Sequence, residues 1–209
     1  MLTIEEARQY YPSADSAHDF DHVLRVLALA ERLAHAEGAE VEIVRAAALL
    51  HDVARADEDA GRVADHAVSG AARAQEILLA RGMAPARVHA VAHAIATHRF
   101  RGTAVPQTLE AQIVFDADKL DSIGAIGIAR AYAVSGALKQ RLWSAVAPET
   151  LATREQHTAQ HTAFAEFVVK LSKVRDRLFT TTARQIAEQR HAFMVEFFTR
   201  LEREVRGEL

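Results

Sequence analysis

The sequence predicts an all-α protein, and three observations support this fold class. The 209-residue chain contains 9 Gly and 4 Pro, roughly half of the ~12% that average usage would give, so turn signals are scarce. Apolar residues recur at spacings of three and four along most of the chain, which is the period of an amphipathic helix. No internal repeat, low-complexity segment or linker rich in Pro or Ser interrupts this pattern. We therefore expect one helical domain over residues 1–209.

The first two predicted helices are close in the sequence. Residues 20–36 carry an apolar stripe at helical spacing, with Asp15 or Ser16 available as the N-cap and Gly38 as the stop. Residues 41–54 form a short helix whose middle, AAALL, is wholly apolar. Such a helix is typical of the centre of a bundle, where every face is buried.

Further helices follow without a long interruption. Residues 65–81 form a helix that ends at Gly82, and residues 85–98 form one that begins with a proline, which suits a first helical turn. Pro106 opens the next helical run, which contains the segments DADKLD and IGAIGIARAYA.

The second half of the chain is predicted to be helical around one irregular segment. We expect Gly124 and Gly127 to permit close helix packing rather than to break the run that contains them. Residues 136–153 show the weakest periodicity and are expected to be irregular. Residues 154–206 are expected to form two long amphipathic helices that meet near residues 180–182.

Composition excludes several kinds of site. The chain has no Cys, which rules out disulfides, thiolate metal sites, iron–sulfur clusters and Cys nucleophiles. A net charge of −3 argues against a nucleic-acid-binding protein. No stretch of ~18 apolar residues predicts a membrane span, and the acidic N-terminus lacks the apolar core of a signal peptide. We expect a cytoplasmic protein with neither nucleic-acid nor membrane partners, in which any transition-metal site uses the 11 His and the carboxylates.

Four residues form the most informative set: His22, His51, Asp52 and Asp118. The His51-Asp52 pair ends an apolar helix, where burying an imidazole and a carboxylate is costly unless something such as a divalent metal pairs them. Adjacent helical residues project about 100° apart, so both reach one ion only near a helix end or from neighbouring coordination positions. His22 lies on the preceding helix and Asp118 on a later one, and ligands from several helices are how bundles build internal metal sites.

Four motifs carry a family resemblance. They are HDFDHVLRV at residues 18–26, ALLHD at 48–52, DADKLDSIGAIGIAR at 116–130 and TTARQIAEQRHAFMVEF at 181–197. Their order resembles that of the HD-domain metal-dependent phosphohydrolases, whose pattern is H…HD…D, and most of all that of their small stand-alone bacterial members. The resemblance covers most of the chain and implies an HD-domain helical bundle.

This resemblance implies that His22, His51, Asp52 and Asp118 are the ligands of one divalent metal ion. Mixed nitrogen and oxygen ligation suits Mn²⁺, our first choice, and is compatible with Mg²⁺, Ni²⁺, Co²⁺, Fe²⁺ or Zn²⁺. Such an ion lowers the pKa of a bound water and polarises a phosphoryl oxygen. In the implied mechanism, Asp52 or a pocket histidine holds or relays the proton of that water.

His66 and His98 are the candidate pocket histidines. In two-metal HD enzymes, histidines after the HD dipeptide hold a second ion, and such members often carry two adjacent histidines where this chain has His98 followed by Arg99. This departure favours a phosphate contact over a metal ligand at that point. We therefore assign His66 and His98 catalytic roles in the substrate pocket, with a second metal site or a surface position as alternatives.

A phosphorylated substrate needs local cations, because the protein as a whole is acidic. The candidate substrate-binding residues are His18, Arg25, Arg99, Lys119 and Asp121. Arg25 lies about one turn beyond His22 and shares its helix face, and Lys119 and Asp121 flank Asp118. Arg25, Lys119 and Arg99 could instead be solvated charges or members of salt bridges. His18 could instead be a residue at the start of a helix.

The resemblance implies hydrolysis of nucleotides, which are the expected small-molecule partners. The predicted reaction is pyrophosphohydrolysis of (deoxy)nucleoside triphosphates, which gives a monophosphate and pyrophosphate. A 5′-nucleotidase acting on (deoxy)nucleoside monophosphates uses the same parts and is the nearest alternative. A di-iron HD-type oxygenase requires a complete second-metal site, and a non-catalytic ligand-sensing module is a further alternative. The sequence is compatible with a homodimer.

Overall fold

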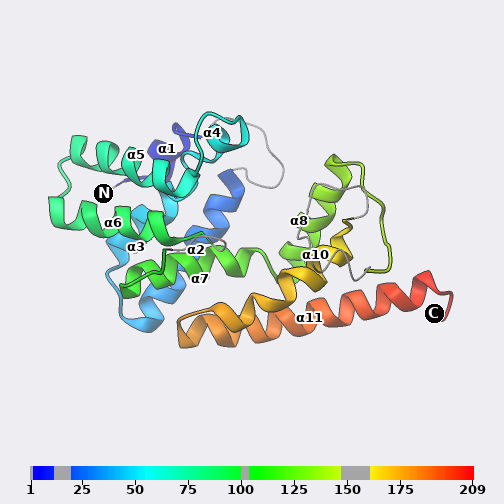
Figure 1. The fold of residues 1–209 in the computed structure, drawn as a ribbon. Helices are drawn as coiled ribbons and strands as arrows, with labels where there is room; N and C mark the ends of the chain where they lie inside the picture. Colours follow the sequence, from blue (N-terminus) through cyan, green and yellow to red (C-terminus); the bar gives the residue numbers. More distant parts are fainter. Residues whose placement is uncertain (1, 12–19, 100–103, 147–160) are drawn as a thin grey trace. The chain divides into compact units, whose positions relative to one another are not determined.

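The computed structural model describes residues 2–11, 20–99, 104–146 and 161–209, and all its regular elements in these ranges are helices (Figure 1). The all-α prediction is therefore confirmed. The chain divides into two compact units, unit 1 with Met1–Lys119 and Leu178–Ala183, and unit 2 with Leu120–Arg177 and Arg184–Leu209. The single domain over residues 1–209 stays a prediction. None of the described helices is long and apolar enough to cross a membrane.

Unit 1 is built around a buried central helix. Its helices are α1 (Ile4–Arg8), α2 (Phe20–Glu37), α3 (Val41–Leu50), α4 (Arg55–Asp59), α5 (His66–Ala80), α6 (Pro85–Thr97) and α7 (Leu109–Asp121), the last of which ends in unit 2. Helix α3 packs against both α2 and α6, and α6 packs against α5. The AAALL segment of α3 is almost wholly buried, because apolar residues occupy every face of the helix there. Its predicted central position is confirmed.

The helix ends of unit 1 follow the expected chemistry, with one difference. The side chain of Asp65 caps α5 by accepting hydrogen bonds from the backbone N–H groups of Ala67 and Val68, and Pro85 opens α6. The helix predicted for residues 41–54 ends at Leu50 and is followed by turns. The proposed caps Asp15 and Ser16 lie outside the described residues.

Unit 2 contains α8 (Gly124–Ala137), α10 (Ala163–Val169), the 3₁₀ turns η1 (Leu171–Lys173) and η2 (Arg175–Arg177), and most of α11 (Thr181–Val205). Helix α10 packs against α8. Phe167 of α10 stacks on Phe198 of α11 with 4.6 Å between ring centroids, and Phe198 is fully buried. Aromatic side chains therefore supply much of the core of this unit.

Two predictions for the second half need correction. The run that begins near Pro106 is broken, because α8 starts anew at Gly124, whose φ of +79° favours glycine. Gly127 does serve a close approach, since a Cβ atom there would lie 2.3 Å from the carbonyl oxygen of Ser122. The long helix α11 is as expected, whereas the segment before it contains only the short α10 and two 3₁₀ turns in the part that the structure describes.

Candidate metal centre

Six His and Asp side chains of unit 1 come from the ends of helices. His22 lies in the first turn of α2, His51 and Asp52 follow α3 directly, His66 opens α5, His98 follows α6, and Asp118 lies in the last turn of α7. Five of the six residues are buried, and Asp118 is the most exposed, with 15% of its side chain accessible. Because α3 ends at Leu50, the adjacent residues His51 and Asp52 lie in the turns that follow it, and their side chains reach the same place.

The first group consists of His22, His51 and Asp118, whose ligand atoms converge. The Nε2 atoms of His22 and His51 are 3.3 Å apart, and His22 Nε2 is 3.5 Å from Asp118 Oδ1. Asp52 Oδ2 lies 3.7 Å from His22 Nε2 and 3.6 Å from His51 Nε2. The structure thus brings together all four residues that the sequence singles out as metal ligands.

The second group consists of Asp52, His66 and His98. Asp52 Oδ1 lies 3.3 Å from His66 Nε2 and 3.5 Å from His98 Nε2, and these two nitrogens are 3.3 Å apart. The carboxylate of Asp52 is therefore shared, with Oδ2 facing the first group and Oδ1 facing the second. This sharing places the two predicted pocket histidines beside the predicted metal ligands.

Hydrogen bonds on the far side of three imidazoles determine which ring nitrogen carries the proton. His51 Nδ1 lies 2.8 Å from the carbonyl oxygen of Ala48, and His98 Nδ1 lies 2.6 Å from that of Ile95. His66 Nδ1 lies 2.6 Å from Glu58 Oε2. All three partners are acceptors, so we assign the proton of each neutral ring to Nδ1, which leaves a lone pair on each inward-facing Nε2.

The inward-facing atoms consequently fit cations. In the second group, two lone pairs and a carboxylate oxygen lie within 3.5 Å of one another, an arrangement of acceptors that repel unless a positive ion lies between them. Imidazole nitrogens and carboxylate oxygens suit Mn²⁺, Fe²⁺, Co²⁺, Ni²⁺ and Zn²⁺. The two groups are therefore suited to divalent metal ions, whose identity the donor atoms leave open.

Burial and nearby charges favour the protonation states in which these side chains can bind a metal ion, namely neutral imidazole and ionised carboxylate. Burial lowers the pKa of His51 to about 4, although Asp52 and Asp118 oppose the shift. Burial raises the pKa of Asp52, but His51 and His98 more than offset this and hold it well below its usual range. The pKa of Asp118 is lowered too, because Lys119 and the nearby histidines outweigh its burial. Near neutral pH, His51 is therefore neutral while both carboxylates are ionised.

Two predicted phosphate-binding cations lie on the helices that carry His22 and Asp118 of the first group. The Lys119 ammonium contacts Asp118 Oδ2 and is largely buried. Arg25 is partly buried on α2, three residues beyond His22. A phosphate contact for either residue stays a prediction.

Arg99 has a different setting from the one expected. Its Nη1 atom lies 2.9 Å from Glu58 Oε1 and 2.9 Å from Asp65 Oδ2. The guanidinium thus bridges two carboxylates, one of which also binds His66.

The remaining predicted substrate-binding residues are Asp121 and His18. Asp121 is buried in unit 2, where its Oδ2 lies 2.9 Å from Arg130 Nη1. His18 lies outside the described residues. Substrate binding by these two residues stays a prediction.

The sequence does not reveal the roles of Glu58 and Asp116. Glu58 reaches His66 only because α4 turns the chain back towards the start of α5. Asp116 is fully buried and accepts hydrogen bonds from the backbone N–H groups of Phe179 and Thr180 and from the Thr180 hydroxyl. One signal for Asp116 exists, since residues two apart on a helix face opposite sides, so Asp116 and Asp118 of one motif cannot serve the same site.

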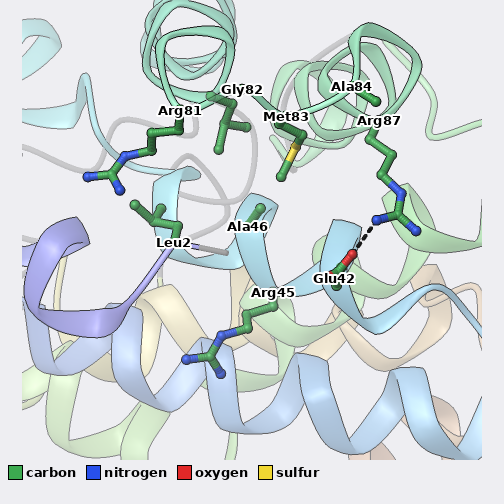
Figure 2. A pocket seen from close by; sticks show the side chains of 10 residues that line it. Leu2, Glu42, Arg45, Ala46, Arg81, Gly82, Met83, Ala84 and Arg87 are labelled. Carbon is green, nitrogen blue, oxygen red and sulfur yellow. Dashed lines mark hydrogen bonds and ion pairs between the residues drawn. The ribbon is translucent and has the colours of Figure 1, made fainter.

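A cavity of about 490 Å³ in unit 1 is separate from these groups, because none of the six residues lines it (Figure 2). Three arginines border it, and each already pairs with an acid. Arg45 pairs with Glu31, Arg81 with Glu6 and Arg87 with Glu42. The cavity therefore lacks the uncompensated positive charge of an anion site.

Comparisons with known proteins point to one family. A model of the HD domain matches residues 19–123, a segment that contains all six site residues. The chain is 33% identical over 196 residues to YpgQ of Bacillus subtilis, covering 92% of this chain and 86% of that protein. A crystal structure of YpgQ in complex with ADP has 32% identity and a TM-score of 0.73, covering 98% of this chain and 99% of that one. A crystal structure of an HD-superfamily hydrolase from Bacillus thuringiensis has 29% identity and a TM-score of 0.76, covering 97% and 94%.

Proposed function

This chain belongs to the HD-domain family, and on that premise we propose that it is a metal-dependent phosphohydrolase of nucleotides. The reaction we propose is release of pyrophosphate from (deoxy)nucleoside triphosphates. The observation that carries the proposal is the carboxylate of Asp52, shared between two groups of inward-facing imidazole lone pairs. The complex of the related YpgQ with ADP supports a nucleotide as the ligand.

The proposed site holds two ions, one more than the sequence predicts. His22, His51 and Asp118 would hold one ion, His66 and His98 would hold the other, and Asp52 would contribute one oxygen to each. A divalent ion bound in such a site lowers the pKa of a coordinated water and polarises a phosphoryl oxygen. His66 and His98 would thus act in catalysis as ligands rather than as proton carriers.

Substrate is proposed to approach the first group. Asp118 is the most exposed of the six residues, and Lys119 beside it supplies a positive charge. Lys119 and Arg25 would offset the charge that develops on the phosphate oxygens during cleavage. The ionised Asp52 carboxylate would accept a hydrogen bond from the attacking water and so orient it.

Two alternatives rest on the same residues. A 5′-nucleotidase differs only in which phosphorus atom is held at the site, so its products distinguish it. A di-iron oxygenase needs a second metal site, and the group of Asp52, His66 and His98 meets that requirement. The chemistry of the bound metal and the products must therefore be measured together.

The test is a panel of nucleoside mono-, di- and triphosphates assayed with Mn²⁺ and with Fe²⁺, scoring phosphate, pyrophosphate and triphosphate separately. We expect pyrophosphate and a monophosphate from triphosphates with Mn²⁺. Phosphate from monophosphates would instead establish a 5′-nucleotidase. Two irons per chain with no phosphate product from any nucleotide would support the oxygenase and overturn the proposal.

A further inference from the structure

We propose that Glu58 and Arg99 are positioning residues that orient His66 and thereby set the occupancy of the second metal group. This inference rests on the two-ion site of the proposed function. It gives Arg99 a role within the protein, whereas its phosphate contact stays a prediction. A continuous series of charged hydrogen bonds joins three segments of unit 1 and carries this inference.

The series begins at His66. Its Nδ1 atom donates to Glu58 Oε2 at 2.6 Å, and 4% of the His66 side chain is exposed. A carboxylate behind a ligating histidine holds the ring orientation and makes the other nitrogen more basic. Glu58 therefore determines both where Nε2 of His66 points and how strongly it binds a cation.

Glu58 is held in turn by Arg99. The guanidinium Nη1 lies 2.9 Å from Glu58 Oε1, so the two oxygens of Glu58 have separate partners. Arg55 lies farther from Glu58 Oε2, with its Nη1 at 3.9 Å. Arg99 thus holds the carboxylate of Glu58 in place.

Arg99 also binds the start of the helix that carries His66. Its Nη1 lies 2.9 Å from Asp65 Oδ2, while Asp65 Oδ1 caps α5 through Ala67 and Val68. Asp65 immediately precedes His66, and Arg99 immediately follows His98. One guanidinium therefore ties together the two helix ends that supply the histidines of the second group.

The first group shares none of these contacts. Its side chains come from α2, α7 and the end of α3. Its own carboxylate, Asp118, pairs with Lys119. Loss of Glu58 or Arg99 should therefore weaken binding of one ion only.

The test is a titration of the full-length protein with Mn²⁺ alone, which resolves the dissociation constant of each ion by calorimetry and counts bound ions by electron paramagnetic resonance. In Glu58→Ala and Arg99→Met we expect the second dissociation constant to rise roughly 10- to 100-fold, as is usual when the partner of a ligating histidine is lost. The first dissociation constant should stay within about twofold of the wild-type value, and Arg99→Lys should recover part of the loss.

Matched controls are Asp59→Asn, an adjacent acid that pairs with Arg55, and Arg62→Met, an exposed arginine that pairs with Asp57. Both should leave the two constants unchanged. Far-UV circular dichroism verifies folding, and if Glu58→Ala does not fold, Arg99→Met and Arg99→Lys carry the test.

Three results would overturn the inference. They are equal weakening of both ions, an unchanged second constant combined with a raised KM for a triphosphate in Arg99→Met, or a wild-type protein that binds a single Mn²⁺. A wild-type protein that binds two Mn²⁺ but hydrolyses no nucleotide would instead overturn the proposed function and leave the positioning role intact.

Discussion

The two metal groups use the same kinds of donor atoms, but His66 is held differently from His51 and His98. His51 and His98 each follow the end of a helix and donate Nδ1–H to a carbonyl three residues earlier. Those carbonyls can accept these bonds because the last turn of a helix leaves its C=O groups without their usual helical partners, although the Ile95 carbonyl also accepts the backbone N–H of His98. His66 opens a helix, where the free backbone groups are N–H donors rather than acceptors. It therefore needs a side-chain acceptor, and Glu58 supplies it.

This difference indicates which histidine should lose its orientation most easily when a neighbouring residue is substituted. A histidine at a helix C-terminus is held by its own backbone and tolerates changes in neighbouring side chains. A histidine at a helix N-terminus depends on a carboxylate from elsewhere in the chain, together with whatever holds that carboxylate. His51 and His98 should accordingly be less sensitive than His66 to changes in the side chains around them.

The largest effect should come from Asp52, the residue that the two groups share. In Asp52→Ala we expect both ions to be lost and nucleotide hydrolysis to fall by roughly 10³-fold or more, because each group loses its common oxygen donor. Metal content after dialysis and the turnover rate are the measurements, with circular dichroism to verify the helical fold.

Asp57→Ala is the control for this substitution, since Asp57 pairs with Arg62 and belongs to neither group. It should retain metal and activity. If Asp52→Ala kept one ion at full affinity and turned over normally, the two groups would not be coupled through this carboxylate.

A smaller, selective effect should distinguish His51→Asn from His98→Asn. We expect the first variant to lose the ion of the first group and the second variant to lose the other, with turnover falling about 10²-fold in either. Counting bound Mn²⁺ by electron paramagnetic resonance should give one ion in each. His89→Asn, an exposed histidine of α6, is the matched control, and loss of both ions from both variants would show a single indivisible centre.

The smallest effect concerns the stability of the metal-free protein in acid. Burial lowers the pKa of His51 from 6.5 to about 4 and also lowers that of His66. Between pH 6.5 and 4 the unfolded chain binds protons that the folded chain does not, so the free energy of unfolding decreases as the pH falls. The contribution of His51 is at most about 3 kcal/mol.

Urea unfolding in EDTA from pH 7.5 to 4.5 measures this dependence. His51→Asn should show a shallower decrease than the wild-type protein over the same range. Stability that rose on acidification would mean that His51 is charged in the folded state.

Much of the fold was predictable because helical periodicity is a local property. The boundaries of α2, α5, α6 and α11 agree closely with the sequence pattern. The break before α8 was not predictable from periodicity, since the apolar spacing continues across it while Gly124 adopts a positive φ. The early end of α3 was also missed, although a helix end close to His51 is one of the two arrangements that let adjacent residues reach one ion.

For the site, the sequence determined the residue types of the first group and the helix ends that carry them. His22, His51, Asp52 and Asp118 stand next to apolar helical segments, where buried polar side chains need a partner. The tertiary structure alone decided that Asp52 faces two groups. It also decided that Glu58 binds Nδ1 of His66 and that Arg99 binds Glu58. The physical reason is that these contacts depend on how α3, α5 and α6 pack together and on where α4 directs the chain, and neither is encoded in local spacing.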